Sequence, residues 1–247
     1  MKRSGQAAAR VLQAIGEAVR PGVSTLELDR ISREQIDALG ATSSFLGYRP
    51  QGHPAYPATI CASPNNEIVH GIPREGCILT DGDIVSIDVA VRLDGYHGDN
   101  AFTFRVGQAP EEAERLMTVT REALDRAIDA ATPTNRLGDV GFAVQEHVEA
   151  SGFSVIRALC GHGIGRSMWE TPQIPNHGSP GTGPRLRPGM VLAIEPMITA
   201  DGPEITFLPD GWGTATADDS LSAHFEHTIA ILSDGPEVLT ANPALWG

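Results

Sequence analysis

Residues 82–104 constrain the fold more than any other segment of this 247-residue chain. Apolar residues alternate with other residues in its first half, at Val85, Ile87, Val89 and Val91, which is the period of a β-strand. The Asp94-Gly95 pair then favours a two-residue turn, because both central positions of a type I′ turn need a positive φ. The segment therefore predicts a β-hairpin in which Leu93 lies opposite Tyr96.

This register places two aspartates on one face of the hairpin. Asp88 would lie opposite Ala101 and Asp99 opposite Ala90, so the two aspartates are diagonal neighbours, roughly 7–8 Å apart at Cα. Solvent-facing aspartates on an edge hairpin are the simpler interpretation of such a pair. Asp88, however, interrupts an apolar run typical of a buried strand, and burying an unpaired carboxylate costs several kcal/mol. A bound cation would remove that cost, so we expect a metal site here.

Two further carboxylates interrupt apolar strands in the second half of the chain. Glu195 ends the apolar run 191–194 and is followed by a proline, which breaks the strand ladder or marks a sheet edge. Glu226 stands at the entrance of another strand-like run. His162 lies between glycines in the segment 161–165, where other groups can approach its ring closely. A lone histidine is more often structural, but this context favours a metal ligand.

These residues form a candidate ligand set of four carboxylates and one imidazole: Asp88, Asp99, His162, Glu195 and Glu226. Two divalent ions would balance its four negative charges, and one nitrogen among oxygens suits Mn²⁺, Fe²⁺, Co²⁺ or Zn²⁺ better than Ca²⁺. Two ions ~3.5–4 Å apart can share carboxylates and activate a water for hydrolysis. His70 is a candidate proton or hydrogen-bond donor. The other histidines are interpreted as structural or surface residues: His53, His97, His147, His177, His224 and His227.

The order helix, turn, helix, strands occurs twice along the chain. Apolar residues at helical spacing predict four helices, over residues 5–19, 24–39, 110–131 and 135–150. Ser24 with Glu27 three residues later indicates a capping box at the start of the second helix. A loop rich in Gly, Pro and Tyr follows over residues 47–57.

This repetition predicts an α+β fold with two related halves, about 5–107 and 110–235, in a single catalytic domain over residues 1–247. A repeated order of helices and strands also arises by chance, so this order alone does not decide whether the two halves are related by duplication. The carboxylates favour it, because each half contributes two of them on strands.

Composition narrows the classes of function. The formal net charge of −13 argues against nucleic-acid and anionic-membrane partners, which attract basic surfaces. No apolar run approaches the ~20 residues that span a bilayer, and no signal peptide is expected. The cysteines Cys61, Cys77 and Cys160 are widely spaced and form no disulfide framework or zinc ribbon, so we expect a cytoplasmic location.

Taken in order, these motifs resemble those of type I methionine aminopeptidases, which have the pita-bread fold, with two pseudo-symmetric αβ halves around an antiparallel sheet. The resemblance covers nearly the whole chain. It rests on residues 21–31, 66–73, 81–89, 94–99, 160–166, 194–197, 210–212 and 221–229.

The resemblance implies roles for individual residues. The five candidate ligands match the ligands of the family; Asp99 and Glu226 would bridge both ions, and Asp88 would bind one of them bidentately. Glu195 would also move the proton of the attacking water, and His70 would assist at the scissile amide. The methionine pocket would be lined by Tyr56, Cys61, Met168 and Trp212, where soft, flexible contacts suit a thioether.

Two features depart from the family's pattern. The family has a second histidine seven residues after the ligand histidine, in contact with the scissile carbonyl, whereas this chain has Trp169 after His162. Tryptophan donates one N–H but cannot accept a proton or act as an acid. Losing a donor aimed at developing charge can cost ~10²–10³ in rate. The loop 47–57 is also longer than usual, and we expect it to reshape the substrate cleft; Trp169 is itself a candidate substrate-binding residue.

The function implied is a metal-dependent aminopeptidase that hydrolytically removes N-terminal methionine from peptides and nascent proteins. Two alternatives stay open: a paralogue of altered specificity or reduced activity, and a pita-bread binding protein that has lost catalysis. The intact ligand set argues against the second of these. The expected partners are peptide or nascent-chain N-termini, and the chain is expected to be a monomer; docking on the ribosome is left open.

Overall fold

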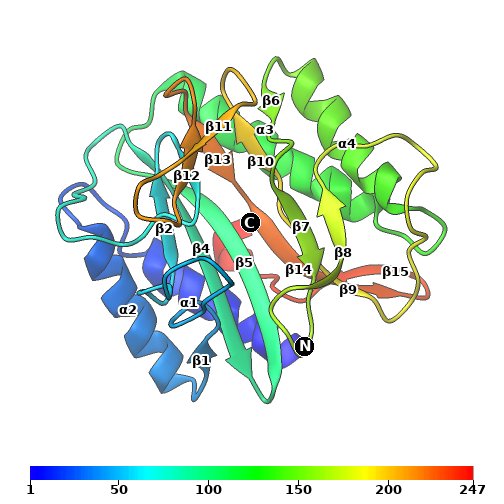
Figure 1. Cartoon of the computed structure of the whole chain (residues 1–247), viewed down its shortest axis with the longest axis horizontal. Helices are drawn as coiled ribbons and strands as arrows, with labels where there is room; N and C mark the ends of the chain where they lie inside the picture. Colours follow the sequence, from blue (N-terminus) through cyan, green and yellow to red (C-terminus); the bar gives the residue numbers. More distant parts are fainter. Residues whose placement is uncertain (247) are drawn as a thin grey trace.

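One curled antiparallel sheet carries the buried strands of both halves in the computed structural model, which describes residues 1–246 (Figure 1). Its strands run in the spatial order β1-β4-β5-β14-β9-β7-β8, with β2 on β4 and β15 on β14. Their bounds are β1 Thr42–Ser43, β2 Cys61–Pro64, β4 Ile84–Leu93, β5 Tyr96–Arg105, β7 Cys160–Gly163, β8 Glu170–Pro175, β9 Val191–Ile194, β14 Glu226–Leu232 and β15 Gly235–Val238. The two halves thus meet where β5 pairs with β14.

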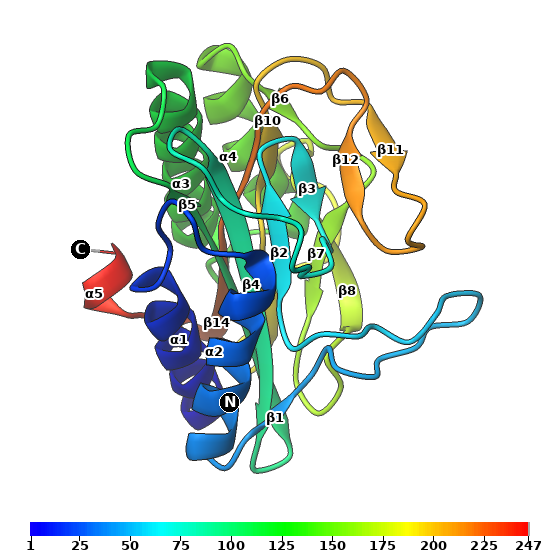
Figure 2. The ribbon, with the colours of Figure 1, turned by 90° about the vertical axis from the view of Figure 1, so that its left-hand side faces the viewer.

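Two small sheets lie beside the large one. The first has the order β13-β10-β6, with β6 at Ser154–Val155, β10 at Met197–Thr199 and β13 at Ser222–His224. The second has the order β11-β12-β3, with β3 at Glu67–Val69, β11 at Ile205–Phe207 and β12 at Thr214–Thr216. Figure 2 shows β3, β11 and β12 on the side of the large sheet that faces away from the helices.

The four predicted helices are present. Their bounds are α1 Lys2–Gly16, α2 Thr25–Ala38, α3 Glu111–Ala130 and α4 Leu137–Ala150, followed by the short α5 at Pro243–Trp246. The first prediction is displaced by three residues, because α1 ends at Gly16 and the apolar pattern continues through a turn. Ser24 accepts the backbone N–H of Glu27 at 3.1 Å and so caps α2. No helix within residues 1–246 has the length and apolar content to cross a membrane.

The helices cover one face of the sheet (Figure 2). The first half packs α1 and α2 on β4, with a core that includes Leu12, Leu28 and Ile87. The second half packs α3 and α4 against the strands that follow them, with a core that includes Leu124 and Val144. Both cores exclude water from the back of the sheet, so the opposite face is left for polar side chains.

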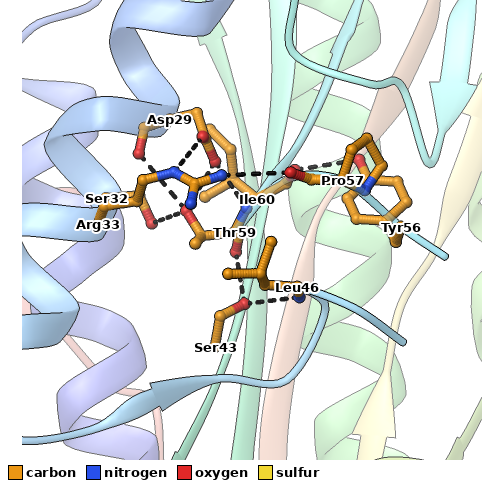
Figure 3. Close-up of polar contacts among 9 residues, drawn as sticks. All are labelled: Asp29, Ser32, Arg33, Ser43, Leu46, Tyr56, Pro57, Thr59 and Ile60. Carbon is orange, nitrogen blue, oxygen red and sulfur yellow. Dashed lines mark hydrogen bonds and ion pairs between the residues drawn. The ribbon is translucent and has the colours of Figure 1, made fainter. Parts of the chain in front are cut away.

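A buried aspartate on α2 anchors the chain that leads into β2 (Figure 3). Asp29 accepts hydrogen bonds from the backbone N–H of Thr59 at 2.6 Å and from its hydroxyl at 2.7 Å. Arg33 donates to the same carboxylate at 2.7 Å and to the carbonyl of Pro57. Ser43 donates to the carbonyl of Thr59 at 3.2 Å. These contacts fix the C-terminal end of the loop 47–57 against the helix layer.

The contact between α1 and β5 depends on a glycine next to one of the candidate ligands. A Cβ on Gly98 would lie 2.5 Å from the backbone nitrogen of Gly5 and 2.6 Å from the carbonyl carbon of Ser4. These are backbone atoms, so they cannot move aside as a flexible side chain would. Gly98 therefore lets α1 lie directly on β5 beside Asp99.

We predict that Gly98→Ala destabilises the chain by about 1–3 kcal/mol, because overpacking must push α1 away from β5. Urea-induced unfolding followed by circular dichroism measures this loss. Gly76→Ala is the matched control, since Gly76 is exposed and its added Cβ meets no atom within 4 Å. An unfolding midpoint for Gly98→Ala equal to that of the control would contradict the packing argument.

Candidate active site

The hairpin of β4 and β5 has the predicted register. Its turn residues Asp94 (φ 52°) and Gly95 (φ 81°) both have the positive φ that the turn requires. The observed pairs include Leu93 with Tyr96, Ala90 with Asp99 and Asp88 with Ala101. The two aspartates are therefore diagonal neighbours on one face of the hairpin.

Strand pairing across the sheet brings candidate ligands of the second half to this same face. Glu226 lies opposite the β5 residue that also pairs with Asp88, so both carboxylates stand in one row across three strands. In a neighbouring row, Thr228 of β14 pairs with Ala193 of β9, which pairs with His162 of β7. Because side chains along a strand alternate between faces, Thr228 and Glu226 share a face, and His162 shares it with them.

The ligand atoms converge in the middle of this face. Asp99, His162 and Glu226 each offer a ligand atom, and these atoms lie within 4.8 Å of one another. The Nε2 atom of His162 lies 3.7 Å from Oε1 of Glu195 and 3.9 Å from Oδ2 of Asp99. The Nδ1–H of His162 donates to the carbonyl of Gly163 at 2.9 Å, which leaves the Nε2 lone pair free to bind a metal.

The buried oxygens of the cluster lack hydrogen-bond partners. Within residues 1–246, Oδ1 of Asp88, Oδ1 of Asp99 and Oε1 of Glu226 are all buried and unpaired. Burial, and then repulsion by neighbouring carboxylates, raises the pKa of Asp88, Glu195 and Glu226 well above the usual range. Burial raises the pKa of Asp99 to about 7. Divalent cations fit this cluster, because they would pair the orphaned oxygens and offset the repulsion.

A cluster of soft and aromatic side chains lies beside the carboxylates. It contains three of the predicted pocket residues, Tyr56, Cys61 and Met168, all buried, and Trp212 packs against them. Cys61 of β2 pairs with Asp88, which places the cluster next to the ligand rows. The hydroxyl of Tyr56 lies within hydrogen-bond distance of the carbonyls of Ile60, at 3.0 Å, and Gly71, at 2.9 Å. The ring of Tyr56 meets that of Trp212 edge-on, with centroids 5.1 Å apart. The four predicted residues thus lie together.

His70 stands at the end of β3 with φ 61°, a left-handed conformation that is uncommon outside glycine. Together with His162, Glu195 and Trp169 it lines a cavity of about 360 Å³. Burial, and then the nearby His53, lowers the pKa of His70 to about 4. Its imidazole is therefore neutral at pH 7, where it can donate a hydrogen bond into the cavity.

Trp169 also faces this cavity. Its ring centroid lies 6.1 Å from that of His162 and 4.3 Å from that of Tyr48, both in edge-on geometry. A second cavity, of about 420 Å³, shares Trp169 and His70 with the first and extends to Tyr48 and Trp212. The loop 47–57 closes over it, since Nδ1–H of His53 donates to the carbonyl of Gly211 at 2.9 Å. The structure thus brings Trp169 and the long loop together at the mouth of the site.

Two residues that contact Glu195 were not among the predicted site residues. Asn176 donates its side-chain N–H to the carbonyl of Glu195 at 2.9 Å. His224 is buried, and its Nε2 atom lies 3.7 Å from Oε2 of Glu195. A signal for His224 was present, because it lies two residues before Glu226 and strand periodicity repeats every two residues.

Comparison with known proteins identifies the family. The model of metallopeptidase family M24 matches residues 1–233. The chain is 49% identical to a methionine aminopeptidase of Clostridium perfringens over 240 residues, which cover 97% of this chain and 94% of the relative. It is 48% identical to methionine aminopeptidase B of a Synechocystis species, again over 97% of this chain and over 88% of the relative. The solved structure of a methionine aminopeptidase from Thermotoga maritima superposes with a TM-score of 0.94 at 43% identity, covering 98% of this chain and 95% of that one. The chain therefore belongs to metallopeptidase family M24, in the branch of the methionine aminopeptidases, and has their pita-bread fold.

Proposed function

We propose that the chain hydrolytically removes methionine from the N-termini of peptides and nascent proteins. The observation that carries the proposal is the convergence of Asp99, His162 and Glu226, from three strands of both halves, on one point of the sheet face. The methionine aminopeptidases to which the chain is similar support the same activity. They favour neither alternative, that is, neither a paralogue of altered specificity or reduced activity nor a binding protein without catalysis.

Two divalent ions, Mn²⁺, Fe²⁺, Co²⁺ or Zn²⁺, are proposed as the cofactors. The residues that would hold them are Asp88, Asp99, His162, Glu195 and Glu226. Such ions supply Lewis acidity, which makes water nucleophilic at neutral pH and polarises a carbonyl. The support for two ions is the charge balance, since four ionised carboxylates and one neutral imidazole carry four negative charges.

The chain's own groups would then position the substrate and move a proton. The methionine side chain would enter the cluster of Tyr56, Cys61, Met168 and Trp212, whose polarizable contacts suit a thioether. Glu195 would take a proton from the attacking water, because its carboxylate faces the cavity beside His162. His70 would donate a hydrogen bond at the scissile amide as a neutral imidazole.

An altered specificity or reduced activity is the second candidate, and the contact of Trp169 with Tyr48 is the observation that favours it. Trp169 replaces an imidazole expected to meet the scissile carbonyl. The hydrogen bond of His53 to the carbonyl of Gly211 holds the loop 47–57 beside the cavity that Trp169 lines. The ligand set is the same under both proposals, so they differ only in the rate and choice of substrate.

Further proposals concern the domain organisation of the chain, its oligomeric state, its cellular location and the form of its substrates. We propose one catalytic domain with related halves, about 5–107 and 110–235, supported by one helix pair and one core in each half. A monomer suffices for the chemistry, because all five candidate ligands come from one chain. The three unpaired cysteines support a cytoplasmic location. Free or ribosome-bound peptide N-termini would both serve as substrate.

Purified chain loaded with Mn²⁺ or Co²⁺ should cleave Met-Ala-Ser and leave Leu-Ala-Ser largely intact, as measured by release of the free amino acid. Glu195→Gln should lower kcat by roughly 10²–10⁴-fold, because it removes the proposed general base. Glu204→Gln changes an exposed acid outside the cluster and should match the unchanged chain. Absence of turnover with every metal would refute the proposed function.

The affinity for Mn²⁺ should rise with pH. With a pKa of about 7, the carboxyl of Asp99 is still partly protonated near neutrality in the metal-free cluster, and a cation must displace that proton. The group of Asp99 alone, with a pKa of about 7, makes the Kd about tenfold lower at pH 8 than at pH 6. Calorimetric titrations at the two values of pH, in buffers of different ionisation enthalpy, measure the affinity and the protons released. A Kd that is the same at pH 6 and pH 8 would contradict this account.

Trp169→His should raise kcat for Met-Ala-Ser by up to about 10²-fold, because it returns a proton-donating imidazole to the mouth of the site. Trp169→Phe is the control, since it removes the indole N–H without adding an imidazole. If Trp169→His stays at the activity of the unchanged chain, Trp169 is not the residue that limits the rate.

A further inference from the structure

His224 holds an unpaired imidazole against the carboxylate proposed as general base. The side chain is 2% exposed, and its Nε2 atom is buried without a hydrogen-bond partner among the described residues. That atom lies 3.7 Å from Oε2 of Glu195, while Oε1 of the same carboxylate lies 3.7 Å from Nε2 of His162. The carboxylate of Glu195 is therefore placed between two imidazoles, one at each oxygen.

The backbone of His224 is fixed independently of its ring. Its N–H donates to the hydroxyl of Thr103 at 2.9 Å, and that hydroxyl donates to its carbonyl at 2.8 Å. As the last residue of β13 it pairs with Met197 of β10, which begins two residues after Glu195. The sheet thus holds the ring at this position, and none of the hydrogen bonds found for residue 224 involves the imidazole.

The Nε2 atoms of the two imidazoles differ, because one presents a lone pair and the other is expected to carry a proton. His162 uses its Nδ1–H on the carbonyl of Gly163, so its Nε2 atom presents a lone pair to the cavity. For His224, a buried and unpaired ring nitrogen beside a carboxylate is a costly arrangement unless that nitrogen carries a proton and donates it in a hydrogen bond. A separation of 3.7 Å is longer than a hydrogen bond, but such contacts are often long in unliganded sites and shorten in the working complex.

We propose that His224 is a positioning residue, whose neutral imidazole donates Nε2–H to Oε2 of Glu195 and so turns Oε1 toward His162 and the metal ligands. This inference rests on the proposed function, because it assigns a partner to the residue that would bind metal and take the proton. His224 thus places an imidazole beside Glu195. Trp169, in contrast, stands where the family has the imidazole that would meet the scissile carbonyl. Partners of this kind typically fix the orientation and basicity of a metal ligand.

A purely structural role makes a different prediction. If the ring of His224 only filled space between β13 and β10, an apolar side chain of similar volume would serve equally well. If its N–H orients Glu195, only a side chain with a donor can replace it. The comparison of His224→Gln, which keeps an N–H, with His224→Leu, which has none, separates the two roles.

The test measures Mn²⁺ affinity by calorimetry and Met-Ala-Ser kinetics for both variants. His224→Leu should weaken Mn²⁺ binding and lower kcat, each by about 10–100-fold, while KM changes by less than about threefold. His224→Gln should bring both quantities back to within about fivefold of the unchanged chain. His147→Leu, on α4 behind the sheet, is the matched control and should leave Mn²⁺ affinity unchanged.

Two results would overturn the inference. Mn²⁺ affinity and kcat of His224→Leu equal to those of the unchanged chain would show that the imidazole orients nothing, while the proposed function would stand. Equal losses in His224→Gln and His224→Leu would show that the N–H donor is not what matters. If His224→Leu fails to fold, His224→Met provides a flexible donor-free replacement for the same comparison. An unchanged chain that neither binds Mn²⁺ nor cleaves the peptide refutes the proposed function itself, and so is distinguishable from both results.

Discussion

Repulsion among four carboxylates on one face of a sheet is the constraint on which the rest of the structure depends. Asp88 and Glu226 stand in one row across three strands, and Asp99 and Glu195 lie close enough for each ionised group to raise the pKa of others. Such a cluster is stable only if protons or cations neutralise it. The raised pKa values of the carboxyls favour neutralisation by protons when no metal is bound. The buried oxygens without hydrogen-bond partners suit neutralisation by cations. A fold that keeps this cluster must hold its strands rigidly enough to prevent the carboxylates from separating.

The two halves supply that rigidity from behind the sheet. Each packs one pair of helices on its own strands, and the halves join where the hydroxyl of Thr228 donates to the carbonyl of Asp99 at 2.7 Å. In the first half, Gly98 allows α1 to lie against β5 immediately beside Asp99. Packing density behind the sheet is thereby linked to the position of a candidate metal ligand in front of it. This link explains why a residue without a side chain can matter for the site.

The parts of the site that follow from strand periodicity could be predicted from the sequence. The Asp94-Gly95 turn sets the register, and the register alone places Asp88 beside Asp99. Contacts between elements distant in sequence could not be predicted in this way. The approach of His224 to Glu195 depends on the pairing of β13 with β10, and the contact of Trp169 with Tyr48 depends on how the loop 47–57 closes. The position of His224 two residues before Glu226 indicates a shared face, but no local pattern in the chain identifies Glu195 as its partner or Tyr48 as the partner of Trp169.

The candidate metal ligands and the residues proposed to face the substrate are held by different parts of the fold, so metal binding and turnover need not depend on the same contacts. The ligand rows are set by backbone pairing of β4, β5, β14, β9 and β7. Trp169, by contrast, lies at the rim, where side chains of the loop 47–57 and the segment before β8 meet. A substitution at the rim can therefore change the group proposed to meet the scissile carbonyl without moving a candidate metal ligand. We therefore expect a substitution of Trp169 to change the rate of turnover without changing metal binding, whereas a substitution of His224 would change both through Glu195.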